Sequence, residues 1–307
     1  MANVKNESMK TRNVVEIIGK VKENKLQCDK DKVNGSLVIQ YGNRPQDQVE
    51  VKIYIGRTKK DGEENKTYDT AKEWVKLVSE AQATEEYPVD VVRIYNGKAD
   101  FAPCIRLNEY KNENTGEVVS VPEISLGFGK VYKGDFTEDR FKGEFDVVVY
   151  LHKNPKKEVI KGEETGRLIA EALMLEHDGA VKPLTFIVED EELIEGISEC
   201  EKGQTVNFWG SCQIAQIEET KVKKSGFGGK AKTESNSYSQ RQLIVEGGDP
   251  IEEDDKQAID SEFIKKALLE RETFLENLSK EEKDSKPKTK GGFGGDGVKK
   301  KNGDIPF

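Results

Sequence analysis

Alternation of apolar and polar residues marks a series of strands in the first third of the chain. In residues 49–55, valine and isoleucine occupy every second position, and Glu50, Lys52 and Tyr54 lie between them. A period of two is typical of a strand with one buried face, so Lys52 and Tyr54 are expected to share the opposite face. Further β-rich runs occur at 13–22, 37–41, 89–95 and 101–110.

One helix is expected between the third and fourth of these strands. Thr70 and Glu73 have the spacing of a capping box, and apolar residues follow at helical spacing as far as Ala81. Trp74 lies on that apolar face and is expected to fill the core under the sheet. Three strands, a helix and two strands form the sequence order of the OB-fold, a five-stranded Greek-key barrel.

A partial repeat predicts a second unit of the same kind. Residues 50–57 and 146–153 share a succession of acid, β-branched residue, tyrosine, large aliphatic residue and base, and shorter matches pair 17–21 with 127–131 and 101–104 with 209–212. Ordered matches of this kind indicate a duplicated unit. The elements expected in the second unit are strands at 123–133 and 141–153, a helix at 164–175, and strands at 184–188 and 205–218.

The remaining chain changes in composition. Residues 249–282 carry 12 acids and 5 bases beside an apolar helical stripe, which predicts an acidic amphipathic helix. Three interpretations of this helix stay open: a packed extra element, a docking helix for a partner, or a DNA mimic that shields a binding face. The fold class expected is mainly β, with two tandem OB-fold domains plus a C-terminal helix and a disordered tail. The predicted organisation is a flexible arm at 1–11, OB-like domains at 12–117 and 118–222, a Gly/Ser/Lys-rich linker at 223–248, the acidic helix at 249–282 and the tail at 283–307.

Composition narrows the class of protein. The net charge is −9, so any anion-binding surface must be a local basic stripe on an acidic body. No apolar run approaches the roughly 20 residues of a membrane span, and no signal-peptide pattern is present, so a cytoplasmic protein is expected. Four cysteines form no CxxC pair and the two histidines stand apart from them. Neither a zinc site nor a disulfide framework is expected, and no cofactor is predicted.

Enzyme motifs are weak. Lys59, Lys60, Asp61 and Gly62 match the KxDG of nucleotidyltransferases, but no companion motif accompanies them. Residues 127–130 read Gly-Phe-Gly-Lys, which is not the GxxxxGK[ST] of a P-loop. The prediction is a protein that is not an enzyme.

The last four residues resemble a motif of a known protein family. They are Asp304, Ile305, Pro306 and Phe307. This terminus resembles the tip of bacterial and bacteriophage single-stranded-DNA-binding proteins, which combine OB domains, a disordered linker and this closing tetrapeptide. The resemblance implies single-stranded DNA binding in replication, recombination and repair, in a bacterial or infected bacterial cell, with partner proteins recruited through the tip. Lysines at 299–301 stand where the family usually has acids. The resemblance leaves a monomer or a homodimer open.

Sequence-independent binding of a single strand requires cations for phosphates and flat side chains on which bases stack. The predicted strands supply both, although each aromatic side chain has core packing as its alternative role. The candidate DNA-binding residues are Lys20, Lys52, Tyr54, Arg57, Phe101, Phe128, Lys130, Tyr150, Lys153 and Trp209. The alternative function is a non-enzymatic protein-binding scaffold built from tandem β-barrels, which the acidic body would suit.

Overall fold

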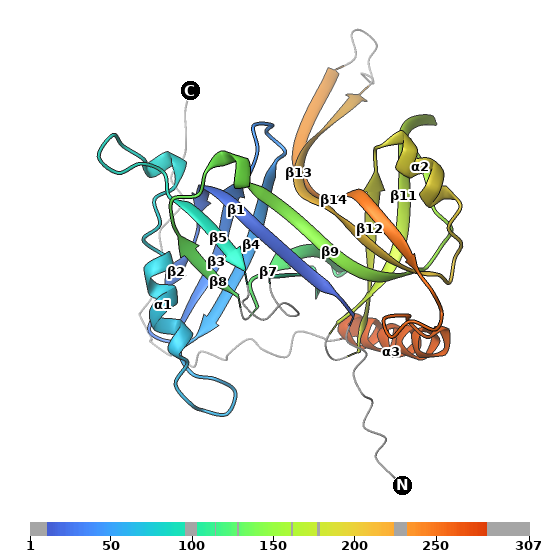
Figure 1. Ribbon diagram of the computed structural model, residues 1–307, viewed down its shortest axis with the longest axis horizontal. Helices are drawn as coiled ribbons and strands as arrows, with labels where there is room; N and C mark the ends of the chain where they lie inside the picture. Colours follow the sequence, from blue (N-terminus) through green and yellow to red (C-terminus); the bar gives the residue numbers. More distant parts are fainter. Residues whose placement is uncertain are drawn as a thin grey trace, which may run out of the picture.

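The computed structural model describes residues 11–95, 103–113, 115–127, 129–160, 162–176, 179–223 and 232–280, and within them the protein is mainly β (Figure 1). The strands are β1 (Asn13–Asn24), β2 (Gln27–Cys28), β3 (Lys32–Gln40), β4 (Gln48–Gly56), β5 (Val91–Tyr95), β6 (Cys104–Lys111), β7 (Val118–Ser125), β8 (Lys130–Lys133), β9 (Lys142–Leu151), β10 (Lys156–Ile160), β11 (Glu163–Leu175), β12 (Val181–Val188), β13 (Thr205–Lys223) and β14 (Lys232–Ile251). The helices are α1 (Lys66–Trp74), α2 (Glu191–Ser198) and α3 (Ser261–Lys280), with 3₁₀ turns η1 (Glu80–Gln82) and η2 (Glu138–Arg140).

The first barrel has the strand order of an OB-fold. β1 pairs antiparallel with β3 and with β5, and β3 pairs antiparallel with β4. β4 runs parallel to β7, while β8, which follows β7 in the chain, pairs antiparallel with β5. Taking β7 and β8 together as the fifth strand, the ring closes in the order 1-2-3-5-4-1, which is a Greek-key barrel. α1 connects the third strand to the fourth and buries Ala71 and Trp74 in the core.

The second barrel repeats this order strand for strand. β9 pairs antiparallel with β11 and β13, and β11 pairs antiparallel with β12. β12 runs parallel to β14, and β13 and β14 form a long antiparallel hairpin. α2 again connects the third strand to the fourth. Phe145, Phe186 and Phe208 meet in its core, with ring centroids 5.8 and 5.3 Å apart for the two successive pairs.

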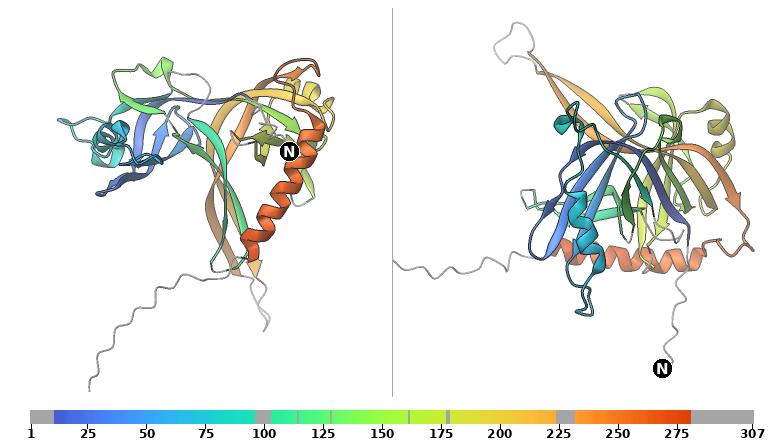
Figure 2. Two further views of the ribbon diagram at one scale, coloured as in Figure 1. Left: turned by 90° about the horizontal axis from the view of Figure 1, so that it is seen from below. Right: turned by 60° about the vertical axis from the view of Figure 1, so that its left-hand side comes forward.

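The two barrels share one continuous sheet. The first strand of each barrel, β1 and β9, pair antiparallel from Asn13 opposite Val147 to Ile18 opposite Lys142. Figure 2 shows the barrels side by side, with α3 lying against the second barrel. The inner side of α3 packs Ile264 and Ala267 onto Tyr150 and Leu173. Of the three interpretations of this helix, the structure shows a packed element.

Several predicted elements are corrected. Residues 164–175 form the strand β11, not a helix, because Leu168, Ala170, Ala172 and Met174 alternate into the core. Residues 118–133 complete the first barrel, so the boundary predicted at 117/118 divides that barrel and the second begins at β9. The run at 101–110 contains β6, an arm of a hairpin, and is not the fifth barrel strand.

The C-terminal predictions change as well. The described part of the segment predicted as a linker, 223–248, belongs to the β13–β14 hairpin. Within the acidic segment predicted at 249–282, β14 extends to Ile251 and the helix α3 begins at Ser261. Most of the predicted arm and all of the predicted tail lie outside the described residues. None of the described helices combines the length and apolar character needed to cross a membrane.

Candidate functional site

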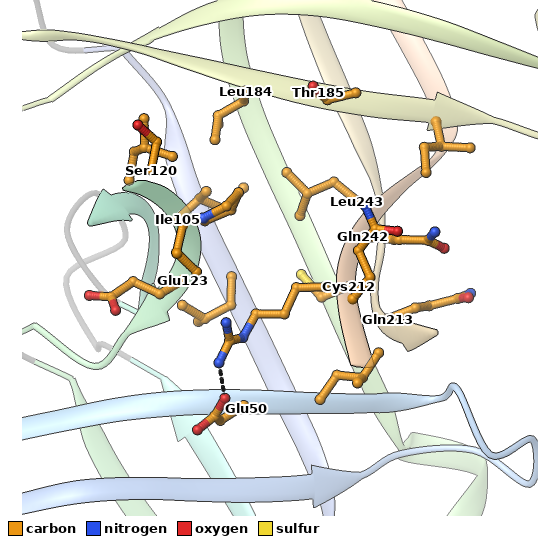
Figure 3. A pocket seen from close by; sticks show the side chains of 18 of the residues that line it. Glu50, Ile105, Ser120, Glu123, Leu184, Thr185, Cys212, Gln213, Gln242 and Leu243 are labelled. Carbon is orange, nitrogen blue, oxygen red and sulfur yellow. Dashed lines mark hydrogen bonds and ion pairs between the residues drawn. The ribbon is translucent and has the colours of Figure 1, made fainter. Parts of the chain in front are cut away.

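A cleft of about 530 Å³ lies between the two barrels (Figure 3). We call it the inter-barrel cleft. Its walls come from the third strand of each barrel, β4 and β12, and from the hairpins β6–β7 and β13–β14. Each hairpin is formed by the fourth and fifth strands of its barrel where they project beyond it, so the two barrels contribute equivalent elements. Its lining includes apolar side chains (Ile105, Leu107, Ile124, Leu184 and Leu243) and polar ones (Glu50, Ser120, Glu123, Thr185 and Arg241).

The long β13–β14 hairpin reaches the first barrel because three contacts tie it there. The hydroxyl of Tyr41 donates a hydrogen bond of 2.9 Å to the carbonyl oxygen of Cys212. The backbone N–H of Ile214 donates one of 3.0 Å to the carbonyl oxygen of Gln46. The guanidinium of Arg241 pairs with the carboxylate of Glu50 on β4 across the cleft. The hairpin therefore forms a wall between the barrels.

The pKa values of two cleft carboxylates are shifted in opposite directions. Burial would raise the pKa of Glu50, but hydrogen bonds from Lys52 and Arg241 outweigh it and lower the pKa to about 2. For Glu123 on β7, burial outweighs the attraction of nearby cations and raises the pKa. Glu50 is thus an ionised carboxylate whose charge is balanced by Lys52 and Arg241, and Glu123 is more easily protonated than an ordinary glutamate.

Two of the predicted DNA-binding residues, Lys52 and Tyr54, share the outer face of β4, whose first residues line the cleft. β4 alternates as expected, with Val51 and Ile53 in the core and Lys52 and Tyr54 on the outer face. The side chain of Tyr54 is 70% exposed, and the ammonium of Lys32 on β3 lies 5.8 Å from its ring centroid. Arg57 follows directly after β4 and is exposed. Gln48 and Glu50 of the same strand line the cleft, and Lys52 and Tyr54 continue the outer face of β4 beyond it.

The other described candidates do not join this group. Tyr150 is 8% exposed and packs under α3, so it has no surface for a base. Lys153 pairs with Glu171 at 2.5 Å near the second-barrel side of the cleft. Trp209 is 37% exposed on β13, close against Gly247, where a Cβ atom would lie 2.4 Å from the indole.

Two candidate lysines lie on the first barrel outside the cleft. Lys20 on β1 pairs with Glu138 at 2.6 Å, and Lys130 is exposed on β8. The remaining candidates lie outside the described residues. These are Phe101, Phe128, Asp304, Ile305, Pro306 and Phe307.

Sequence reasoning missed the residues contributed by the hairpins. Arg241 and Tyr238 lie on β14, within the segment predicted as a linker because it is rich in glycine and serine. The run Leu243, Ile244 and Val245 was the available signal, since a β-branched run predicts a strand. The stacked pair of Tyr95 and Tyr132 on the first barrel was also missed.

Comparison with solved structures and families gives the following similarities. The crystal structure of the wild-type single-stranded DNA binding protein from Thermus aquaticus is similar, with a TM-score of 0.45, 12% identity and coverage of 79% of this chain and 94% of that one. A deletion mutant of the same protein gives a TM-score of 0.47, 14% identity and coverage of 80% and 97%. No curated protein matches the chain. The family described as YorF matches residues 11–281. Since that match spans most of the sequence, the chain belongs to the YorF family.

Proposed function

We propose that the inter-barrel cleft and the outer part of β4 bind single-stranded DNA without sequence preference. The observation that carries the proposal is the convergence of both barrels on one cleft. In OB-folds the face of strands two and three and the loops between strands four and five are the parts that bind oligonucleotides. Here β4 and β12 and both of the corresponding hairpins line a single space.

The outer part of β4 has the chemistry that a single strand requires. Tyr54 presents a ring on which a base stacks, the ammonium of Lys32 lies 5.8 Å from the centroid of that ring, and Lys52 shares the same face of the strand. Single-stranded nucleic acid exposes both base faces and phosphates, whereas a duplex hides the base faces in its stack. Preference for single strands over duplex follows from this difference.

The wider role extends the resemblance noted in the sequence. The protein protects single-stranded DNA in replication, recombination or repair, in a bacterium or a bacteriophage-infected cell, as a monomer or homodimer. The C-terminal tip recruits partner proteins, because its free carboxylate suits a basic side chain and the ring of Phe307 suits an apolar pocket. Isothermal titration of a peptide of the last residues against candidate replication proteins, with Phe307→Ala as control, tests this part.

The test of DNA binding is fluorescence anisotropy of a labelled oligo-dT of about 30 nucleotides, a length that about two to seven OB folds occupy. The same length of duplex is measured in parallel across a salt series. Tight, salt-sensitive binding of the single strand alone is expected. Tyr54→Ala is expected to weaken it by about 1–3 kcal/mol, the range for one stacked base. Arg57→Gln is expected to reduce the log–log salt slope by about 0.7.

Tyr87→Ala is the matched control, because Tyr87 is 59% exposed in the segment between η1 and β5, away from the cleft. Equal losses in Tyr54→Ala and Tyr87→Ala would contradict the assignment of the cleft. The second candidate function is a protein-binding scaffold, favoured by the carboxylates of Glu50, Glu123 and Glu171 in the lining. No binding of oligo-dT at low salt would support the scaffold and refute the DNA proposal.

A further inference from the structure

The outer face of the β5–β8 pair carries a second group of aromatic and basic side chains. Val92 and Ile94 on β5 and Val131 on β8 point into the core, being at most 7% exposed. The residues between them therefore point outwards. These outward residues are Arg93, Tyr95, Lys130 and Tyr132, which we call the β8 platform.

Cations and rings alternate across the platform in both directions. Arg93 lies opposite Tyr132, and Tyr95 lies opposite Lys130, in the antiparallel register of the two strands. The rings of Tyr95 and Tyr132 stack with centroids 5.0 Å apart and an interplanar angle of 28°. The guanidinium carbon of Arg93 lies 4.2 Å from the centroid of Tyr95, which makes a stack of three flat groups. Tyr132 remains 41% exposed.

The two cations of the platform differ in their ion pairing. Arg93 is fixed by Glu16, which accepts hydrogen bonds of 3.1 Å from Nε and 2.7 Å from Nη2. Glu16 also pairs with Lys142 at 2.7 Å. Lys130 is exposed, and no carboxylate in the described part of the chain lies within ion-pair distance of its ammonium. The platform thus combines a rigid stack with one available cation.

The first barrel carries the platform and also supplies part of the wall of the inter-barrel cleft. β5 pairs with β8 in the platform, and β6 pairs with β7 beside the cleft. Ile105 on β6 and Ser120 on β7 line the cleft.

The chemistry of the platform favours nucleic acid over a protein partner. Lysine is depleted at protein–protein interfaces, where tyrosine and arginine are enriched. Here Lys130 accompanies the two stacked rings, and a cation beside exposed flat groups suits phosphates and bases.

We propose that the β8 platform is a second contact for single-stranded DNA, which takes nucleotides that extend beyond the cleft. Bases stack on Tyr132, supported from behind by Tyr95 and Arg93, and Lys130 pairs with a phosphate. The inference rests on the proposed function, because it assigns the path of the same ligand.

The experiment measures affinity against oligo-dT length, from about 8 to about 40 nucleotides, a range that spans one to several OB-fold sites. The variants are Tyr132→Leu, which removes the ring, and Tyr132→Phe, which retains it, with Tyr87→Leu as the exposed control. Tyr132→Leu is expected to bind the shortest oligomers like the wild type and to bind the longest at least about fivefold more weakly. Tyr132→Phe and Tyr87→Leu are expected to follow the wild type at every length.

Lys130→Gln supplies a second measurement that does not disturb the stack. It is expected to lower the salt slope by about 0.7 for long oligomers and to leave short ones unchanged. Wild-type affinity of both Tyr132→Leu and Lys130→Gln for long oligomers would overturn the inference, while binding of short oligomers that depends on Tyr54 would leave the proposed function standing. Failure of the wild type to bind any length would overturn both.

Discussion

A buried group of three charges holds the hairpin, the second barrel and the C-terminal helix together. The side chain of Glu109 on β6 is 1% exposed. One of its oxygens accepts from the ammonium of Lys182 on β12 at 2.5 Å, and the other pairs with the guanidinium of Arg271 on α3. Lys182 and Arg271 are themselves only 13% and 15% exposed. The cost of burying each of these three charges is therefore compensated by the opposite charge beside it.

Glu109→Ala is expected to destabilise the fold strongly. The change leaves two cations largely buried without a counter-charge, and removal of one partner from a buried ion pair costs about 3–5 kcal/mol. We expect the midpoint of urea unfolding at pH 7 to fall accordingly. Because Arg271 is on α3, hydrogen exchange of α3 amides is expected to accelerate more than that of the β1–β9 ladder.

The matched control is Glu138→Ala, which removes the partner of Lys20 at 2.6 Å on the surface. The carboxylate of Glu138 is 69% exposed, so the loss should be below about 1 kcal/mol. If Glu109→Ala costs no more than Glu138→Ala, burial does not govern this cluster and the reasoning is refuted. Replacing all three residues by leucine or methionine should recover much of the stability, as buried charges often exchange for apolar groups without loss.

Two further predictions concern the hairpin and its contact with β4. Gly210→Ala is expected to disrupt β13–β14 pairing, because its Cβ would lie 2.0 Å from the backbone oxygen of Ile244; a normal melting temperature would contradict this. The lowered pKa of Glu50, about 2 against an ordinary 4.5, stabilises the folded state above pH 4.5, and this contribution is lost as pH falls towards 2. Glu50→Gln should abolish that part of the acid dependence of urea unfolding, and an unchanged profile between pH 6 and about 2.5 would refute the assignment.

The local alternation of apolar and polar residues was enough to place the elements of the first barrel that have one solvent-exposed face. The alternation in β4 predicted correctly that Tyr54 and Lys52 share the outer face, since each strand residue has only two faces to choose between. A helix with Trp74 in the core was predicted too, but its bounds were wrong. α1 begins at Lys66, where Asn65 and not Thr70 is the N-cap, and it ends at Trp74, before Ala81. The mainly β class and the OB-type order followed from these elements.

Long-range pairing decided the rest. The last part of β11, from Ala172 to Leu175, is apolar on both faces, because one face lines the barrel and Leu173 on the other is covered by α3. A run without a polar face looks the same as a buried helix, so periodicity could not distinguish them. The similarity between residues 50–57 and 146–153 wrongly suggested that the two segments are equivalent strands. β4 is the third strand of the first barrel and β9 is the first strand of the second, and only the pairing of strands distant in sequence shows this difference.

The sequence by itself determined which short segments become strands and which chemistry they carry, because alternation and side-chain type are local properties. Only the tertiary structure decided which tyrosine is available to a ligand: Tyr54 is left exposed on the outer face of β4, whereas α3, more than one hundred residues later in the chain, covers Tyr150. It also decided that both hairpins line one cleft. Burial of a given side chain depends on contacts with segments that are distant in the sequence, and a local sequence pattern contains no information on those contacts.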